Sequence, residues 1–528
     1  MACSLQKERV DLVVHNATVY TVDANFSTVG AFAVEEGRIV AVGTLDDLLQ
    51  KYDPGEMFDA GGKTIVPGLI DAHCHFYGLG LNQQLVDLVG TQSFGEVIGK
   101  IKSFHVENPS NVLRGRGWDQ NDWAVKRFPT KTKLDSLFPN IPVVLERVDG
   151  HAYLVNQNVL DMAGITATTQ VDGGEVVLDG NGDMTGVLID NPMGMVDAVM
   201  PKPDRASQIK ALKEAENICF SYGLTTVNDA GLDRSTIELM DSLQKTGDLK
   251  IRVYAMLSNK AANLDYYLPK GPVKTDRLHV CSVKVYGDGA LGSRGATLKR
   301  PYADKPGHHG AMVTPVDEIG NLAERLAKSG FQMNTHAIGD SANVVVLRAY
   351  EKALRGMGDR RWKIEHAQVL DTPDFAFFEK GIIPSVQPTH ATSDMYWAQD
   401  RVGPERINGA YAFKTLLNKA GLVALGTDFP VEQVSPFLTF YAAVTRQDVQ
   451  GFPKGGFLPV ERLSREEALK GMTIWAAYSN FEETEKGSIE VGKWADFTIL
   501  DRDIMKVPVE DIPALQAAAT YVAGERVK

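Results

Sequence analysis

Short apolar and β-branched runs at both ends of the chain predict antiparallel strands. Near the start, such runs cover residues 11–15, 17–22, 32–34 and 38–43, with Asn, Asp and Gly between them. The same pattern returns near the other end in residues 487–489, 495–500 and 519–524. Neither end can bury both faces of a sheet alone, so we expect the two ends to pair in one small β-sandwich.

A repeated strand–helix pattern fills the region from about residue 205 onward. Residues 207–222 have a helical pattern and precede an apolar strand at 224–229. Further short strands that end in polar residues are expected at 283–288, 331–336, 362–366, 384–390 and 422–428. Repeated βα units indicate a parallel sheet, either closed into a barrel or doubly wound.

The stretch from about residue 85 to 203 departs from this rhythm. It contains Gly115-Arg-Gly-Trp-Asp, Arg147-Val-Asp-Gly-His and a Gly- and Asp-rich run from Gly173. We interpret it as a large insertion after the first barrel strand that caps the site. The expected domains are therefore a composite β-sandwich of residues 1–66 and 482–528 and a barrel domain of residues 67–481.

Composition and charge narrow the class of protein. The chain has 528 residues and a formal net charge of −12, which repels nucleic acid and anionic membranes. We find neither a signal-peptide core nor an apolar run of about 18 residues, so no membrane span is expected. Four dispersed cysteines, Cys3 among them, favour a reducing, cytoplasmic setting over a disulfide framework. A homodimer is the expected assembly, because it is the commonest symmetric oligomer.

Two histidines in Pro67-Gly-Leu-Ile-Asp-Ala-His-Cys-His carry the clearest chemical signal. His73 and His75 are two positions apart, so on a strand they point to one face. Two imidazoles on one face can bind one metal ion, whereas the alternative is a pair of hydrogen-bonded surface histidines. The preceding apolar strand and Asp71 favour a metal site.

Three further residues lie at expected strand ends, where barrel enzymes place their catalytic groups. His336 and His366 are separated by about one βα unit, so we expect both at the barrel mouth as ligands. Asp428 ends the strand 422–428, where it either caps the next helix or binds metal and takes a proton from water. Neutral imidazole suits zinc, with iron, manganese and nickel as alternatives.

Lys284 lies inside the apolar strand around Val283. A lysine that faces the barrel interior needs a partner, a lowered pKa or chemical modification, because burying an ammonium ion is costly. The functional interpretation is a carboxylated lysine whose carbamate bridges two metal ions. The alternative is an outward side chain with its ammonium group in solvent.

Together these motifs resemble the amidohydrolase superfamily, in the branch that includes N-substituted formamide deformylases. Besides the stretches around His73, Arg147, Lys284, His336, His366 and Asp428, the resemblance includes Gly223-Leu-Thr-Thr-Val-Asn-Asp, Gly287-Asp-Gly-Ala-Leu-Gly-Ser-Arg and Lys486-Gly-Ser-Ile-Glu-Val-Gly-Lys-Trp. The resemblance implies an α/β fold with a (β/α)₈ TIM barrel and a composite β-sandwich. It also implies that strands one, four, five, six and eight carry the metal ligands His73 and His75, Lys284, His336, His366 and Asp428.

The function expected from these residues is metal-dependent hydrolysis of a non-peptide, amide-type C–N bond in a small molecule. One or two divalent ions activate water, and Asp428 moves the proton. Hydrolysis of esters, lactones or phosphoesters on the same barrel is the alternative, and a non-enzymatic relative with lost ligands is a third. The candidate substrate contacts are Trp118, Asp119, Arg147, Asp149, His151, Asp288, Arg294 and His390.

Overall fold

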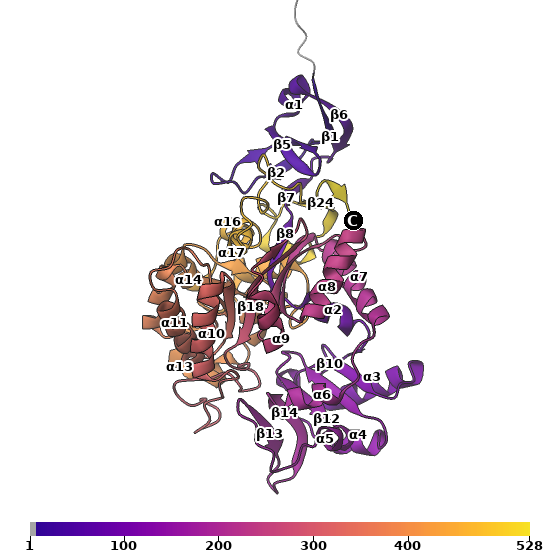
Figure 1. Cartoon of the computed structure of the whole chain (residues 1–528), viewed down its shortest axis with the longest axis vertical. Coiled ribbons are helices and arrows are strands. Elements are labelled where there is room, and N and C mark those ends of the chain that lie inside the picture. Colours follow the sequence, from indigo (N-terminus) through magenta and orange to yellow (C-terminus); the bar gives the residue numbers. More distant parts are fainter. Residues whose placement is uncertain (1–6) are drawn as a thin grey trace, which may run out of the picture.

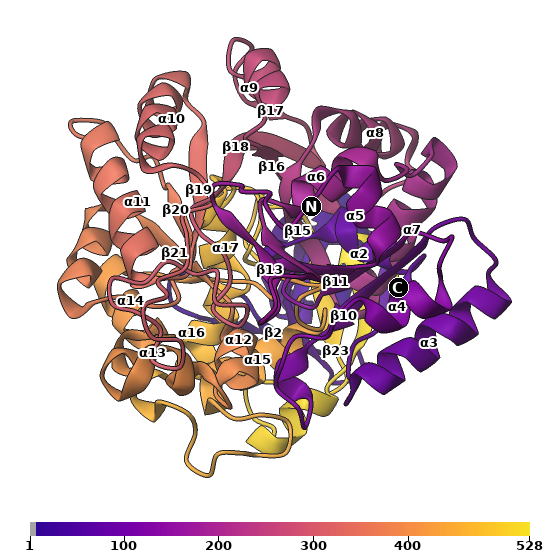
Figure 2. The same ribbon diagram turned by 90° about the horizontal axis from the view of Figure 1, so that it is seen from below.

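A parallel β-barrel forms the centre of the computed structural model, which describes residues 7–528 (Figures 1 and 2). Its strands are neighbours in chain order: β8 (Leu69–Cys74), β15 (Leu224–Leu232), β16 (Arg252–Ser258), β18 (Leu278–Tyr286), β19 (Gln332–Ala337), β20 (Lys363–His366), β21 (Ile383–Val386) and β22 (Ala424–Leu425). The short β17 (Val273–Lys274) pairs antiparallel with β18. The expected α/β barrel is confirmed.

Backbone hydrogen bonds bring the first and last strands of this sheet together. The N–H of Asp428 donates to the carbonyl of His73 at 2.8 Å, and the N–H of His75 donates to the carbonyl of Phe429 at 2.8 Å. Gly426 makes this approach possible, because a Cβ there would lie 2.5 Å from the backbone nitrogen of His73. The sheet is therefore a nearly closed barrel.

Helices surround the barrel and cover the outer face of its strands (Figure 2). They are α2 (Phe76–Asn82), α7 (Arg205–Ser221), α8 (Arg234–Thr246), α9 (Ala261–Tyr267), α10 (Val316–Ser329), α11 (Asp340–Ala353), α12 (Pro388–Asp394), α13 (Ala398–Arg406), α14 (Phe413–Ala420), α15 (Pro436–Thr445), α16 (Arg465–Gly471) and α17 (Ile474–Ser479). Strands buried on both faces read as continuous apolar runs, as β18 does.

Strands from both ends of the chain share one sheet. This six-stranded sheet has the order β25 (Glu525–Arg526), β24 (Ala517–Val522), β23 (Phe497–Leu500), β7 (Thr64–Pro67), β2 (Thr18–Tyr20) and β3 (Thr28–Val29). A second sheet has the order β5 (Arg38–Gly43), β4 (Ala31–Glu35), β1 (Glu8–His15) and β6 (Tyr52–Asp59), with α1 (Leu45–Lys51) beside it. Phe32 of one sheet packs edge-on against Phe497 of the other, with ring centroids 5.0 Å apart.

Residues 86–199, which we call the cap, form a separate layer at the end of the barrel opposite these sheets (Figure 1). Its six-stranded sheet has the order β13 (Gly174–Leu178), β14 (Met184–Asp190), β12 (Ala152–Val155), β11 (Val143–Arg147), β10 (Leu113–Trp118) and β9 (Val86–Asp87). Its helices are α3 (Phe94–Glu107), α4 (Thr132–Leu137), α5 (Gln157–Ala163) and α6 (Met193–Val199). The cap has apolar cores of its own on both faces of this sheet.

Two observations bear on the predictions about membrane spans and disulfides. None of the helices within residues 7–528 combines the length and the apolar character that crossing a membrane requires. Cys74, Cys219 and Cys281 are buried free thiols. The fourth cysteine, Cys3, lies outside the described residues.

Candidate metal centre

The predicted ligands converge at the carboxyl ends of the barrel strands, as in other barrels of this kind. His73 and Lys284 lie in β8 and β18, His336 in β19 and His366 at the end of β20. His75 directly follows β8 and precedes α2. The barrel therefore brings together side chains that are hundreds of residues apart in sequence.

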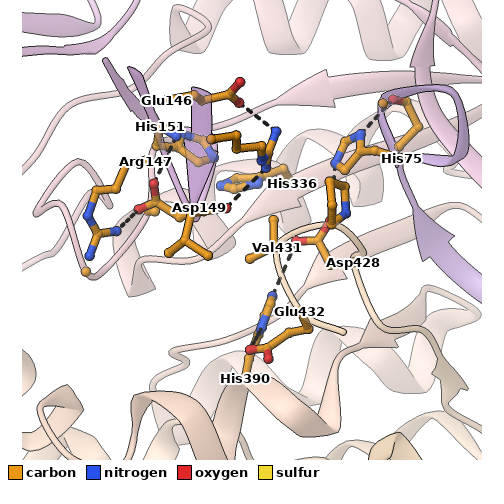
Figure 3. A pocket seen from close by; sticks show the side chains of 18 of the residues that line it. His75, Glu146, Arg147, Asp149, His151, His336, His390, Asp428, Val431 and Glu432 are labelled. Atoms are coloured by element: carbon orange, nitrogen blue, oxygen red, sulfur yellow. Dashed lines mark hydrogen bonds and ion pairs between the residues drawn. The ribbon is translucent and has the colours of Figure 1, made fainter. Parts of the chain in front are cut away.

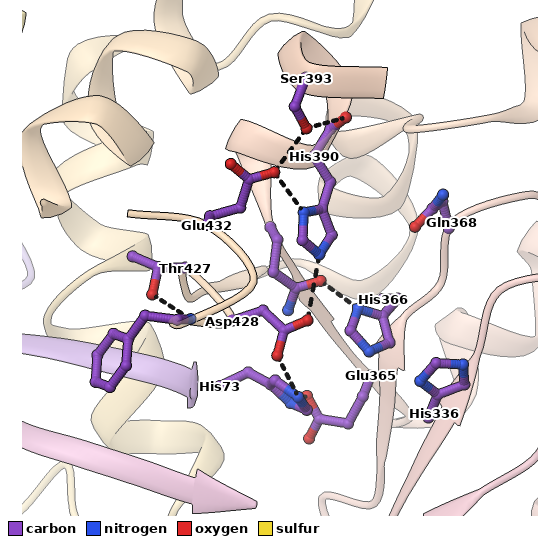
Figure 4. A network of polar contacts seen from close by, with 12 residues as sticks. His73, His336, Glu365, His366, Gln368, His390, Ser393, Thr427, Asp428 and Glu432 are labelled. Carbon is purple, nitrogen blue, oxygen red and sulfur yellow. Dashed lines mark hydrogen bonds and ion pairs between the residues drawn. The ribbon is translucent and has the colours of Figure 1, made fainter. Parts of the chain in front are cut away.

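Asp428 stands at the centre of this group (Figure 4). Its Oδ1 lies 3.4 Å from Nε2 of His73 and 3.2 Å from Nε2 of His75, while its Oδ2 lies 3.3 Å from Nε2 of His390. Two triads with metal-ligand spacing share this carboxylate, one with His73 and His75 and the other with His366 and His390. Each of these groups could hold a metal ion.

The donor set fits a divalent cation. Burial lowers the pKa of His73, and it lowers the pKa of His336 and His366 well below the ordinary value, so these rings are neutral and have free lone pairs. Oδ1 of Asp428 is buried without a hydrogen-bond donor. Neutral imidazoles around an unsatisfied carboxylate oxygen are ligands suited to zinc and similar ions.

Acceptors behind three of the rings fix the orientation of those rings. Nδ1 of His73 contacts Glu365 at 2.6 Å, Nδ1 of His366 contacts Gln387 at 2.7 Å, and Nδ1 of His75 contacts the carbonyl of Ala230 at 3.2 Å. A proton on each Nδ1 leaves Nε2 available as the ligand atom. The sequence analysis missed Glu365 and Gln387, although Glu365, like Lys284, is a charged residue inside an apolar strand.

Asp71 joins the two segments that carry the central ligands. Its carboxylate accepts hydrogen bonds from the hydroxyl of Thr427 at 2.7 Å and from the backbone N–H of His73 at 3.1 Å. Burial raises the pKa of Asp71 to about 7. Asp71 thus holds β8 against the loop that presents Asp428.

Lys284 faces the interior of the barrel, which excludes the outward orientation. The residue is 1% exposed, and its Nζ lies 3.1 Å from Nε2 of His73. Burial lowers the pKa of the amine, although the charges of Glu365 and Asp428 oppose this shift. A lysine with a lowered pKa has a larger neutral fraction, which is the form that reacts with electrophiles such as carbon dioxide.

His336 lies beside the centre but belongs to neither triad. Its ring centroid is 4.6 Å from that of His366, while its Nε2 lies 3.4 Å from the carbonyl oxygen of Gly289. The histidine that completes the second triad is His390 instead. His390 was expected at a strand end but lies in α12, because Pro388 begins a helix directly after β21.

Asp428 also differs locally from the expected strand end. The strand β22 covers only Ala424–Leu425, and Asp428 follows it with a φ of 61°. His366 has a φ of 72°. Two proposed ligands thus adopt a left-handed backbone that non-glycine residues rarely occupy, which is typical of functional sites.

A cavity of about 1030 Å³ extends from the metal centre to the cap. Among the predicted substrate contacts, Asp119, Arg147, Asp149, His151 and His390 line it, as do the predicted ligands His75, Lys284, His336, His366 and Asp428. Figure 3 shows the cap residues Arg147, Asp149 and His151 facing the barrel residues across this space. Cap and barrel thus form the two walls of one pocket.

Three predicted substrate contacts lie outside the lining of this cavity. Trp118 is 1% exposed in the cap core, and its indole N–H donates to the carbonyl of Leu145 at 2.9 Å. Asp288 is fully buried and accepts backbone N–H groups of Thr297, Ile338 and Gly339. Arg294 forms an ion pair with Asp304 at 2.7 Å. Asp288 and Arg294 thus connect neighbouring loop segments.

On the cap wall of the cavity, Arg147 and His151 already have acidic partners within the cap. Arg147 is 1% exposed and pairs with both Asp119 and Asp149. Nδ1 of His151 contacts Asp190 at 2.6 Å. Burial disfavours protonation of His151, but the hydrogen bond and charge of Asp190 outweigh burial and raise its pKa.

Glu432 is a cavity residue that the sequence analysis also missed. Its Oε1 accepts from Nδ1 of His390 at 2.9 Å and from the hydroxyl of Ser393 at 2.6 Å. Burial acts against protonation of His390, yet its hydrogen bonds to Asp428 and Glu432 raise its pKa well above the ordinary value. Glu432 follows Asp428 by four positions, and this spacing alone gave no signal.

The geometry agrees with comparisons to known proteins. A model described as "Amidohydrolase family" matches residues 56–528, and one described as "Imidazolonepropionase-like composite domain, bacteria" matches residues 30–53. The chain is 34% identical to Protein LONG AFTER FAR-RED 3 of Arabidopsis thaliana, over 98% of this chain and 91% of that protein. It is 28% identical to N-substituted formamide deformylase of Arthrobacter pascens, over 97% of each.

A solved structure shows the same architecture. It is an uncharacterized metal-dependent hydrolase from Pyrococcus horikoshii, with a TM-score of 0.77 and 27% sequence identity. The alignment covers 94% of this chain and 99% of that one. The similarity therefore extends over both the barrel and the chain ends.

Proposed function

We propose that this chain, which belongs to the amidohydrolase family and is a metal-dependent hydrolase, cleaves a non-peptide, amide-type C–N bond of a small molecule. The observation that carries the proposal is the position of Asp428. Its carboxylate lies within 3.4 Å of three imidazole nitrogens and lines the floor of a cavity. Asp428 is therefore placed both to hold a metal and to accept a proton.

The proposed ligands are His73, His75, Lys284, His336, His366 and Asp428. These residues would hold a divalent cation, zinc by the donor chemistry, which would supply Lewis acidity for activating water and polarising the scissile carbonyl. The two triads around Asp428 support a site for one or two ions. Carboxylation of Lys284 would add a bridging ligand between them.

Asp428 carries the proton through the reaction. It accepts a proton from the attacking water while the new C–O bond forms at the carbonyl carbon. It then returns this proton to the nitrogen as the C–N bond breaks, so the products are a carboxylic acid and an amine. Asp428 is ionised and so has a free lone pair for the proton: burial raises its pKa, but the contacts with His390 and His75 outweigh burial and hold the pKa well below the ordinary value.

The cap supplies the second wall of the substrate site. Arg147 and His151 face the metal centre across the cavity, which Asp119 also lines, and His390 with Glu432 bounds the cavity on the barrel side. A cavity of about 1030 Å³ accommodates a small organic molecule rather than a protein substrate. Hydrolysis of esters, lactones or phosphoesters on the same residues is the competing function.

The test is a comparison of substrates on zinc-loaded protein. N-substituted formamides, other simple amides and the matching esters are assayed side by side, with Asp428→Asn as the inactive variant and Asp161→Asn, an exposed residue of α5, as the control. We expect amide turnover that Asp428→Asn abolishes while metal content is largely retained. Activity on esters alone, or unchanged turnover in Asp428→Asn, would contradict the proposal.

A further inference from the structure

Three glycines of the loop after β18 face the cap and leave room for its charged side chains. A Cβ at Gly289 or at Gly295 would lie 2.3 Å or 2.4 Å from Oδ2 of Asp190. A Cβ at Gly292 would lie 3.3 Å from the guanidinium nitrogens of Arg147. None of these glycines has a left-handed φ, so the close approach of the cap, not backbone conformation, requires them.

The carboxylate seated between Gly289 and Gly295 belongs to Asp190, the last residue of β14. Two hydrogen bonds tie Asp190 to His151: its Oδ1 contacts Nδ1 of the ring at 2.6 Å, and its N–H donates to the carbonyl of His151 at 3.1 Å. Asp190 has a φ of 57°. A non-glycine residue in this region persists where the surrounding structure requires it.

These contacts leave the other edge of the His151 ring directed to the cavity. Within residues 7–528, no protein group forms a hydrogen bond with its Nε2. His151 lies beside His336 (Figure 3). The centroids of these two rings are 5.1 Å apart, and the His151 centroid is 6.5 Å from that of Tyr286. His151 thus places a free imidazole edge beside the proposed ligands without being one of them.

We propose that His151 is a catalytic residue which the cap supplies to the barrel, and that Asp190 positions it. His151 acts in its doubly protonated form, which the Asp190 carboxylate at Nδ1 stabilises, so its Nε2–H donates a hydrogen bond to the substrate carbonyl oxygen as negative charge develops there. Asp190, which lies between Gly289 and Gly295, holds the ring in its position beside His336. The inference rests on the proposed amide hydrolysis, because it assigns His151 a role in that reaction.

Kinetics separate this role from a structural one. On zinc-loaded protein with an N-substituted formamide as substrate, we expect His151→Ala to lower kcat by about 10²-fold, the usual loss for one oxyanion donor, with a smaller change in KM. Asp190→Ala should also lower kcat, and Asp190→Asn should retain more of it because the amide oxygen still accepts from Nδ1. The control is Asp197→Asn, a cap residue that contacts Tyr153 away from the cavity.

Substitution of Gly295, which lies against Asp190, gives a second test. Gly295→Ala should displace Asp190 and reduce kcat in the wild-type background, yet add little in Asp190→Ala, where the close contact is gone. Additive losses would mean that Gly295 matters for another reason. Zinc content and melting temperature of each variant are measured alongside, because loss of zinc from His151→Ala would make His151 a ligand and overturn the proposal.

A spectroscopic measurement tests the pair without any substrate. In ¹⁵N-histidine-labelled, zinc-loaded protein, the Nδ1 signal assigned by its loss in His151→Gln should shift in Asp190→Asn and stay unchanged in Asp197→Asn. An unchanged signal in Asp190→Asn would overturn the positioning role. If wild-type protein hydrolyses esters but no amide, the proposed function fails, and the same variants assayed on the ester still decide the role of His151.

Discussion

The contact between Glu365 and His73 determines which ring nitrogen of the histidine faces the metal centre. Both residues are fully buried, and the second oxygen of Glu365 has no donor. Such outer carboxylates orient a ligand and make it more basic, and their loss typically weakens metal binding by 10- to 100-fold. Glu365 is therefore as much a part of the site as the ligands.

We predict that Glu365→Gln weakens zinc binding by about 10- to 100-fold, because the amide cannot replace the charge that holds Nδ1 of His73. The measurement is competition with a chromophoric chelator on purified protein. Glu466→Gln, an exposed residue of α16 paired with Lys470, is the control. Equal zinc affinity in both variants would show that Glu365 is dispensable for binding.

At the other end of β18, His279 lies among charged residues that do not take part in the proposed reaction. Its Nδ1 lies 3.4 Å from Oε1 of Glu482, which also pairs with Lys486 at 3.0 Å. Burial lowers the pKa of His279, but contacts with Cys281 and Glu482 outweigh it and bring the pKa to about 9. Folding therefore favours the protonated ring.

A dependence of stability on pH follows from this shift. The folded pKa of about 9 exceeds the ordinary 6.5, so the stabilisation is complete below about pH 6.5 and is lost as the pH rises through 9. Urea unfolding of wild type and His279→Gln at several pH values measures it. The difference in unfolding free energy between wild type and His279→Gln should decrease as the pH rises. A difference that does not change with pH would refute the prediction.

At the scale of elements, the helix that follows the two N-terminal histidines is held by a backbone contact. Gly80 of α2 lies against α7 so closely that a Cβ there would be 1.9 Å from the carbonyl oxygen of Ala211. A side chain at this position must push the two helices apart. Because α2 begins directly after His75, this packing also supports the metal centre.

We predict that Gly80→Ala destabilises the protein by about 1–3 kcal/mol through overpacking. Gly99→Ala is the matched change in α3, where a Cβ meets nothing within 4 Å. Removing glycine from that exposed helix position should stabilise by roughly 0.4–1 kcal/mol. Thermal unfolding of both variants gives the comparison, and a neutral Gly80→Ala would show that α2 can shift without cost.

The sequence predicts elements best where one local pattern decides them. Lys284, His336 and His366 lie in the expected strands because each belongs to a short apolar run inside a βα repeat. His390 was misplaced because its apolar run is cut by Pro388, which starts a helix. Trp118 was predicted as a substrate contact but lies in the cap core, because local sequence does not reveal which face of the cap sheet is turned toward the barrel.

At the scale of the whole molecule, cap and barrel together determine the charge of the cavity. Its arginines are already paired, Arg116 with Glu146 at 2.7 Å and Arg147 with two aspartates. Asp87, Asp122, Asp394 and Glu432 also line it. Among the described residues, the cavity thus offers no unpaired arginine to bind a carboxylate.

We therefore expect the enzyme to disfavour anionic substrates, since placing like charges together costs free energy. A benzyl formamide with a para-carboxylate should have a kcat/KM at least about 10-fold below that of its para-methyl counterpart. A para-aminomethyl analogue serves as the cationic comparison. A higher kcat/KM for the para-carboxylate compound would show that Arg116 or Arg147 leaves its acidic partner when the substrate binds.

The pairing of β7 with β23 has a consequence for how the protein is made. The sheet that contains β2 and β7 is completed only by strands that lie more than 400 residues later in the chain. Because translation proceeds at roughly 5–20 residues per second, these partner strands are synthesised tens of seconds after β7. Until then the edge of β7 that pairs with β23 is unpaired. We therefore expect molecular chaperones to bind nascent chains that are stalled before residue 497.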